Sequence, residues 1–192
     1  NLVLIPPKKG SAGAEVGRSI ESAVGMLQNG SADALVTGPI SKERLQKGGY
    51  RYLGHTDFLA ALANPNSPPK VTMMLANDRL RVTLATVHCS IREVPKRLTL
   101  PAIRLTLENT LGGLRQLFGI AQPRIAVLGL NPHAGENGLL GTEEKSVISP
   151  AIRDFSRGLR KKASIFGPYP ADTYFAAVHP ELRPDAVVAM YH

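Results

Sequence analysis

Short apolar runs of strand length alternate with longer segments of helical periodicity along this chain. The strand-like runs fall at 32–37, 71–76, 80–87, 124–130 and 185–191, and the helix-like segments at 14–27, 101–118 and about 142–162. A further helix is expected after Gly38 with Pro39 in its first turn, and it should stop at Gly48. The turn pair at 77–78 predicts a hairpin between the second and third runs. This alternation predicts an α/β fold whose sheet is at least partly parallel.

The length and the cysteine content narrow the class of protein. The 192 residues are 43% hydrophobic, which is enough for a core without disulfides. No apolar run approaches the ~20 residues that cross a bilayer, so no membrane partner is expected. The single cysteine, Cys89, is interpreted as a buried or incidental thiol, and with the absence of a signal pattern it favours the cytoplasm. Because the sequence starts without Met and stops after an apolar run, we interpret it as a fragment.

The chain carries an excess of positive charge. It has 23 Lys and Arg residues against 15 Asp and Glu, a formal net charge of +8. Such a charge suits nucleic acid, an acidic surface, or a phosphorylated or carboxylated small substrate. Nucleic acid is not expected, because only 5% of the residues are aromatic, Trp is absent, and no zinc-finger spacing is present. The densest basic segment, 153–162, is interpreted as a solvated helix face.

Three histidines directly follow or lie just beyond three separate predicted strands: His88, His133 and His192. Ligands of open α/β sheets bind beyond the carboxyl ends of the strands, where residues distant in sequence converge. Imidazole is a common ligand of zinc and other divalent metals. The pattern therefore predicts a metal site, although each histidine taken alone also fits an ordinary hydrogen-bonded loop residue.

Other polar residues allow two interpretations each. His55 and Thr56 stand at a predicted helix start, where they would bind an anion or where Thr56 would only cap the helix. Asp172 is either a helix cap or a carboxylate that faces the site. Lys42, in a first helical turn, is either an exposed lysine or a contact for an anionic ligand. A Walker loop and a strand-linked G-x-G-x-x-G are both missing from the sequence, so a Rossmann domain is not supported.

Six segments together resemble the 4-hydroxythreonine-4-phosphate dehydrogenase family. They are VTGPISKE at 36–43, GHTDF at 54–58, GLNPHAGE at 129–136, GTEE at 141–144, PADT at 170–173 and AMYH at 189–192. The resemblance implies a fold similar to isocitrate and isopropylmalate dehydrogenases, with a mixed sheet flanked by helices. Residues 1–192 would then be the central part of a two-lobed α/β dehydrogenase, a fragment lacking both family termini, with lobe boundaries that the sequence does not fix.

The resemblance also implies an activity and a site. The family uses NAD or NADP to oxidise 4-phosphooxy-L-threonine, and loss of carbon dioxide gives 3-amino-2-oxopropyl phosphate for pyridoxal phosphate synthesis. A divalent metal (Zn, Mg or Co) would be held by His88, His133 and His192, in a site shared across a homodimer. His55 and Thr56 match the substrate-binding pair, and Lys42 and Asp172 are the candidate catalytic residues. Most of the nucleotide site is expected in the missing C-terminal segment.

Several alternatives to this interpretation stay open. Cys89 and Ser90, which follow His88, depart from the family pattern, so a same-family dehydrogenase for a terephthalate dihydrodiol or a four-carbon sugar-acid phosphate is the alternative activity. A metal-assisted hydrolase would also use three histidines but would need no dinucleotide. A basic nucleic-acid-binding module would show affinity that falls steeply with salt.

Overall fold

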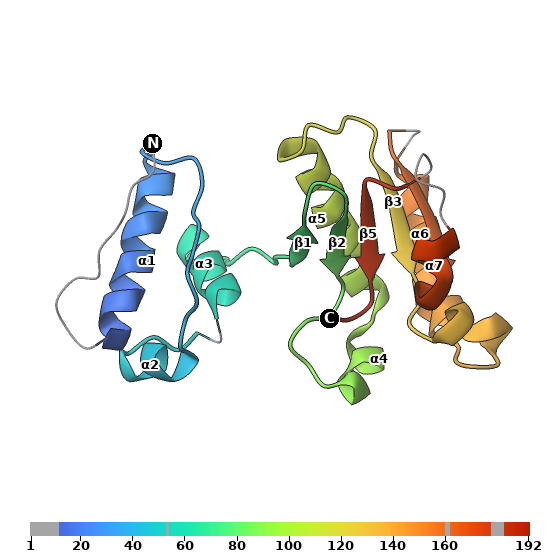
Figure 1. Ribbon diagram of the computed structural model, residues 1–192, viewed down its shortest axis with the longest axis horizontal. Helices are drawn as coiled ribbons and strands as arrows, with labels where there is room; N and C mark the ends of the chain where they lie inside the picture. The colour runs from blue at the N-terminus through green and yellow to red at the C-terminus, as the bar shows by residue number, and fades with distance from the viewer. Residues whose placement is uncertain (1–11, 53, 160–161, 178–182) are drawn as a thin grey trace. The chain divides into compact units, whose positions relative to one another are not determined.

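The computed structural model describes residues 12–52, 54–159, 162–177 and 183–192. The chain divides into two compact units, Asn1–Val71 and Thr72–His192 (Figure 1). Each unit has its own core of buried apolar side chains. Among the described residues, none of the helices combines the length and the apolar character that crossing a bilayer requires.

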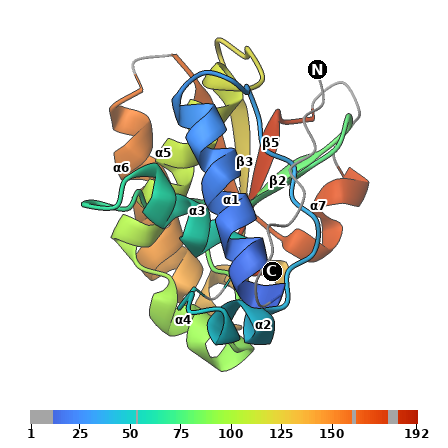
Figure 2. The ribbon, with the colours of Figure 1, turned by 90° about the vertical axis from the view of Figure 1, so that its left-hand side faces the viewer.

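The first unit is helical. It contains α1 (Ala12–Gln28), α2 (Lys42–Lys47) and α3 (His55–Ala63), and both shorter helices contact α1 (Figure 2). The helix predicted over 14–27 is therefore confirmed. Its apolar face meets the other two helices in a small core of Ile20, Val24, Leu45 and Phe58. Close approach at the start of α1 requires Gly13, because a Cβ there would lie 1.6 Å from the Arg44 carbonyl oxygen.

Two details of the first unit differ from the sequence prediction. The strand expected over 32–37 is wrong: the segment forms no ladder, and Val36 is 91% exposed. A strand needs a neighbour to accept its backbone hydrogen bonds, and the described residues of this unit supply none. Pro39 also lies before α2 rather than in its first turn, because the Ser41 side chain caps the helix by accepting a hydrogen bond from the Arg44 N–H. The predicted stop at Gly48 is confirmed.

The second unit is built on a mixed five-stranded sheet. Its strands are β1 (Met74–Ala76), β2 (Arg81–Leu84), β3 (Arg124–Leu128), β4 (Ser164–Tyr169) and β5 (Ala186–Ala189). The order is β1-β2-β5-β3-β4; β1 pairs antiparallel with β2, and every other pair is parallel. The predicted hairpin is confirmed, and the Asn77 side chain closes its turn by accepting hydrogen bonds from the N–H groups of Arg79 and Leu80.

The sequence pattern does not predict β4. Gly167, Pro168 and Pro170 indicate a turn-rich segment, yet the first two lie within this strand. β4 is an edge strand of the sheet, and proline is tolerated at an edge because its missing N–H breaks no inner ladder.

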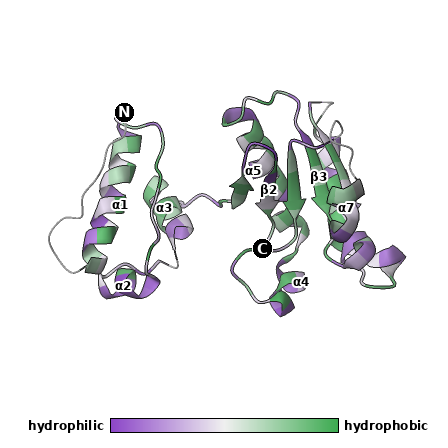
Figure 3. Cartoon of the chain, in the orientation of Figure 1, coloured by the Kyte–Doolittle hydropathy of each residue, from purple (hydrophilic) through white to green (hydrophobic). Residues whose placement is uncertain are grey.

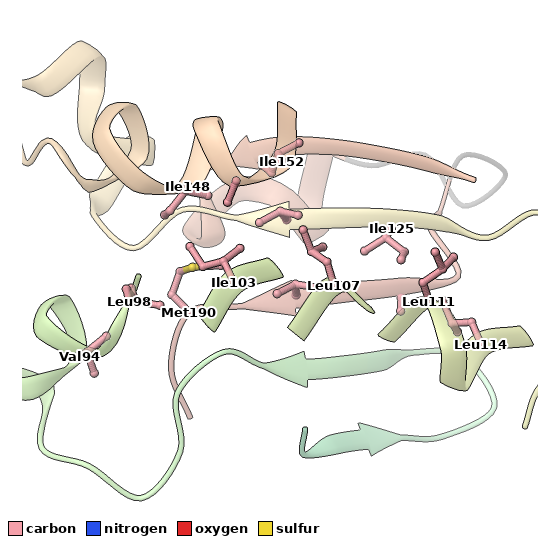
Figure 4. Close-up of a cluster of buried hydrophobic side chains, with 14 residues drawn as sticks. Val94, Leu98, Ile103, Leu107, Leu111, Leu114, Ile125, Ile148, Ile152 and Met190 are labelled. Atoms are coloured by element: carbon pink, nitrogen blue, oxygen red, sulfur yellow. The ribbon is translucent and has the colours of Figure 1, made fainter. Parts of the chain in front are cut away.

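Helices cover both faces of this sheet. Side chains alternate along β3, so Ile125 and Val127 face one layer while Ala126 and Leu128 face the other. The first layer holds the main core, in which α5 (Leu100–Gln116) and α6 (Ser149–Arg157) pack against β3 and β5 (Figure 4). On the other face, Tyr174 of α7 (Ala171–Ala177) packs over β3 and β5. The hydrophobic colour runs along β3 in Figure 3, whereas α2 is largely hydrophilic. The predicted α/β class and mixed sheet are confirmed.

The helix predicted over about 142–162 is shorter and less regular than expected. It begins with a π-helical turn, η3 (Glu144–Ile148), continues as α6, and ends at Gly158. In the basic segment, Arg153 and Arg157 are exposed, as a solvated face requires. Residues 160 and 161 lie outside the described residues. Before α5 the chain forms a short helical pair, η1 (Ile91–Glu93) and α4 (Val94–Arg97).

Candidate functional site

Three neighbouring parallel strands are each followed by a histidine. His88 comes after β2, His192 after β5 and His133 after β3, and these strands adjoin in the order β2-β5-β3. The carboxyl ends of parallel strands lie at one edge of the sheet, so the three residues leave the sheet on the same side. The predicted placement at strand ends is confirmed, while the role of the histidines as metal ligands stays a prediction.

His88 and His192 lie side by side. Their ring centroids are 6.1 Å apart, with the rings nearly perpendicular. Hydrogen bonds that continue the β2–β5 ladder bring them together: the Ala85 N–H donates to the Ala189 carbonyl (2.9 Å) and the Thr86 N–H to the Met190 carbonyl (3.2 Å). The buried Thr86 hydroxyl donates to the same Met190 carbonyl at 2.7 Å. Both histidines line a small pocket whose other walls include Cys89, Ile91, Val94 and Tyr191.

His133 pairs with Asp172. The His133 Nδ1 atom lies 3.4 Å from the Asp172 Oδ2 atom, and both side chains are about half exposed. Asp172 belongs to the first turn of α7, so it is a helical residue whose carboxylate faces the imidazole. A carboxylate at one ring nitrogen fixes the orientation of a histidine and leaves the other nitrogen available for a ligand.

Two of these histidines have an uncommon backbone conformation. His88 has φ of 50° and His133 has φ of 51°, both in the left-handed region. This region costs a non-glycine residue of order 1 kcal/mol or more, and such residues gather where a site requires them. The strain therefore marks two of the three positions that the strand pattern singles out.

The side chains as placed do not form a compact three-ligand cluster. Within the described part of the chain, no three His, Cys, Asp or Glu side chains are close enough together to hold a metal ion. What the structure brings together is the His88 and His192 pair, with the His133 and Asp172 pair on the neighbouring strand end. The chemistry of the donors still fits a metal, because imidazoles at one sheet edge are the ligands that zinc and cobalt favour.

Sequence reasoning missed the residue that holds the His133 loop. From the sequence alone, Thr142 is interpreted as the cap of the helix predicted over about 142–162, and Glu143 and Glu144 as favourable charges in its first turn. In the structure, however, Glu144 is buried, with only 4% of the residue exposed. The Glu144 carboxylate accepts hydrogen bonds from the N–H groups of Leu130 and Asn131, both at 2.7 Å. Glu143 accepts one from the Asn131 side chain at 2.8 Å, and this bond lowers the pKa of Glu143. In the sequence, the glycines of the GLNPHAGE segment are the feature that could have indicated a close contact between this loop and another side chain.

The remaining candidates lie in the first unit. His55 is the first residue of α3, half-buried, and Thr56 is exposed beside it. The N-cap of α3 is Gly54, whose N–H donates to the Asp57 carboxylate (2.8 Å), so the interpretation of Thr56 as the cap is wrong. Lys42 is the first residue of α2 and is exposed.

The thiol of Cys89 belongs to the second unit. It is free and packs, partly buried, against the main core. Its placement matches the interpretation of a buried or incidental thiol.

Comparison with known proteins identifies the family. The family model described as "Pyridoxal phosphate biosynthetic protein PdxA" matches residues 6–192. A 4-hydroxythreonine-4-phosphate dehydrogenase of Desulfosudis oleivorans is 46% identical over 90% of this chain and 49% of its own length. A putative D-threonate 4-phosphate dehydrogenase of Bradyrhizobium diazoefficiens is 40% identical over 97% of this chain and 53% of its own.

Solved structures agree with the sequence comparisons. The crystal structure of 4-hydroxythreonine-4-phosphate dehydrogenase from Klebsiella pneumoniae matches with a TM-score of 0.84 and 38% identity, over 98% of this chain and 56% of that one. The chain spans about half the length of the curated relatives it matches. It belongs to the family of the pyridoxal phosphate biosynthetic protein PdxA.

Proposed function

We propose that this chain is the central part of a two-lobed, NAD- or NADP-dependent dehydrogenase that oxidises the hydroxyl group of 4-phosphooxy-L-threonine. Decarboxylation of the product would give 3-amino-2-oxopropyl phosphate for pyridoxal phosphate synthesis. The observation that carries this proposal is the row of three histidines at one edge of the sheet, in a chain of this family. The relatives named for this activity support it.

The three histidines would hold a divalent metal ion. Three imidazole donors suit zinc or cobalt better than magnesium, which prefers oxygen ligands. When bound, such a cation supplies Lewis-acid stabilisation of the negative charge that develops on the substrate oxygens. The paired strands β2 and β5 keep the His88 and His192 rings adjacent, and the sheet edge also presents His133.

Asp172 would serve the reaction by orienting His133. Its carboxylate faces the Nδ1 atom of His133, which favours a proton on that nitrogen and directs the lone pair of Nε2 toward a ligand. This role replaces proton transfer as our assignment for Asp172, since the contact observed is with a histidine.

His55, Thr56 and Lys42 would contact the anionic parts of the substrate. The first turn of α3 presents backbone N–H groups and the positive end of the helix dipole, with the exposed residue Thr56 in that turn. Lys42 would add a cation from the start of α2. These contacts orient the substrate and exchange no proton with it.

A second substrate has support from one comparison. The relative that covers 97% of this chain is named for D-threonate 4-phosphate, a four-carbon sugar-acid phosphate. This substrate shares the phosphate and the secondary hydroxyl, so the same site chemistry would serve it. A terephthalate dihydrodiol is the non-phosphorylated alternative.

We further propose that the protein works as a homodimer in the cytoplasm, where the free thiol of Cys89 would stay reduced.

The test is NAD and NADP reduction by the intact protein, measured with each of the three substrates and with a chelator control. His133→Ala is compared with Glu108→Gln, which changes an exposed carboxylate on α5. We expect turnover of a phosphorylated substrate that the chelator and His133→Ala abolish and that Glu108→Gln leaves unchanged. Turnover that survives chelation and His133→Ala would refute the metal site, and hydrolysis without dinucleotide would refute the dehydrogenase class.

A further inference from the structure

A buried carboxylate lies beneath the loop that carries His133. The Glu144 side chain, 4% exposed, accepts hydrogen bonds from the backbone N–H groups of Leu130 and Asn131 and from the Asn131 Nδ2 atom at 3.0 Å. Leu130 and Asn131 lie between the end of β3 and His133. A buried charge is costly unless it is fully paired, and here three N–H donors compensate it.

Two glycines make room for this carboxylate. A Cβ at Gly129 would lie 3.0 Å from the Glu144 Oε1 atom, and a Cβ at Gly135 would lie 2.6 Å from the Oε2 atom. The loop therefore wraps the carboxylate from both sides of His133, with Gly129 and Leu130 on one side and Gly135 on the other. Few other side chains could be accommodated between these backbone segments.

The loop itself is conformationally strained. Between Pro132 and Gly138 the backbone runs through five consecutive residues in the left-handed region, four of which are not glycine: His133, Ala134, Glu136 and Asn137. Non-glycine residues rarely remain in this region unless surrounding structure holds them there. The loop thus requires contacts from outside itself to keep its shape.

Adjacent residues of the π-helical turn η3 supply those contacts at both ends of the loop. Glu144 holds the entry at Leu130 and Asn131, and the next residue, Lys145, donates from its Nζ atom to the Asn137 carbonyl at the exit. π-Helical turns are rare in proteins, and those that occur are often found at functional sites. Here the turn brings two consecutive side chains onto one strained loop.

We propose that Glu144 is a positioning residue that, with Lys145, clamps the loop and sets the place of His133 for metal binding. This inference rests on the proposed role of His133 as a ligand. The clamp would act through backbone geometry, because the carboxylate contacts the N–H groups that precede His133 and not the imidazole. Glu144 would be required as an acceptor, because the neutral amide introduced by Glu144→Gln would turn an N–H donor toward groups that are themselves donors.

The experiment measures binding of Co²⁺ to the intact protein by calorimetry, together with the d–d absorption of the bound ion. The variants are Glu144→Gln, Glu144→Ala, His133→Ala and the double variant Glu144→Ala/His133→Ala, with Glu108→Gln as the exposed control. Loss of an outer-shell partner costs about 10–100-fold in metal affinity. We expect a loss in this range for Glu144→Ala, a smaller one for Glu144→Gln, and an altered spectrum in both.

The double variant separates positioning from general destabilisation. If Glu144 acts through His133, Glu144→Ala adds no further loss of affinity once His133 is replaced by alanine. Should Glu144→Ala fail to fold, Glu144→Gln, which keeps the volume, still decides the matter. Wild-type affinity and spectrum in Glu144→Gln and Glu144→Ala, with binding lost in His133→Ala, would overturn the clamp alone. Wild-type binding by His133→Ala would instead overturn the ligand role and the clamp with it.

Discussion

Replacement of Thr86 by valine tests how the sheet brings His88 and His192 together. The Thr86 hydroxyl, in a residue 7% exposed, donates to the Met190 carbonyl at 2.7 Å, two residues before His192. Valine has nearly the same shape, so Thr86→Val removes this hydrogen bond and little packing. The Met190 carbonyl still accepts from the Thr86 N–H (3.2 Å) and is not left unpaired.

The size of the effect follows from this geometry. A buried hydrogen bond contributes about 0.5–1.5 kcal/mol, and because the acceptor keeps one partner we expect a loss of about 1 kcal/mol in the free energy of unfolding. For a protein of this size such a loss lowers Tm by about 2–4 °C. Without the hydroxyl, the two strand ends would separate more readily, so Co²⁺ affinity should fall by a few-fold as well.

The assay compares denaturant unfolding and Co²⁺ titration of the intact protein. Thr83→Val is the control: Thr83 is buried within β2, three residues before Thr86 and farther from the histidines. Its hydroxyl donates to the Val187 carbonyl at 3.4 Å and accepts a hydrogen bond from the Thr110 hydroxyl at 2.9 Å. Thr83→Val should lower stability without changing Co²⁺ affinity. Equal affinity in wild type and Thr86→Val, or an equal loss in both variants, would refute the view that this bond aligns the histidine pair.

Three further predictions concern the second unit. Leu107→Ala, at a fully buried position of the main core, should cost about 2–5 kcal/mol in chemical unfolding, and a loss below about 1 kcal/mol would contradict the packing. Gly135→Ala should lower Tm and Co²⁺ affinity together, since its Cβ would lie 2.6 Å from the Glu144 carboxylate at a φ of 78°; an unchanged Tm would argue against that contact. The lowered pKa of Glu143 means that its stabilising contribution is present above the unfolded value of 4.5 and lost as pH falls through the folded pKa. Below pH 4.5 the stability of Glu143→Gln should therefore depend less on pH than that of the wild type. Acid unfolding curves with the same pH dependence in both proteins would contradict the Asn131 bond.

The sequence predicted those elements whose apolar pattern agrees with their surroundings. The periodicity of Ile103, Leu107, Leu111 and Leu114 predicts α5, because those side chains form the layer over β3 and β5. The failed strand at 32–37 has a strand-like composition but no partner among the described residues, and composition carries no information about partners. β4 was not predicted because a proline argues against a strand, although the edge position of β4 permits one.

The candidate site was predictable in its location and not in its contacts. Strand ends placed the three histidines, because the position of a strand end is a local property of the sequence. The pairing of His133 with Asp172 and the burial of Glu144 depend on how α7 and η3 return to the sheet. Such returns are set by tertiary packing, so a glutamate in a first helical turn is interpreted as a dipole partner until its surroundings are known.

The β2–β5 pairing has a consequence for the order of folding. Thr86 and Met190, which join the ends of these strands, are 104 residues apart in the chain. Closing so long a loop costs entropy that only the assembled sheet offsets, and contacts of this kind form slowly. His88 and His192 therefore become neighbours only when the second unit has completed its topology. A ligand that needs both imidazoles would find no binding site on nascent or partly folded chains, and its capture would report completed folding.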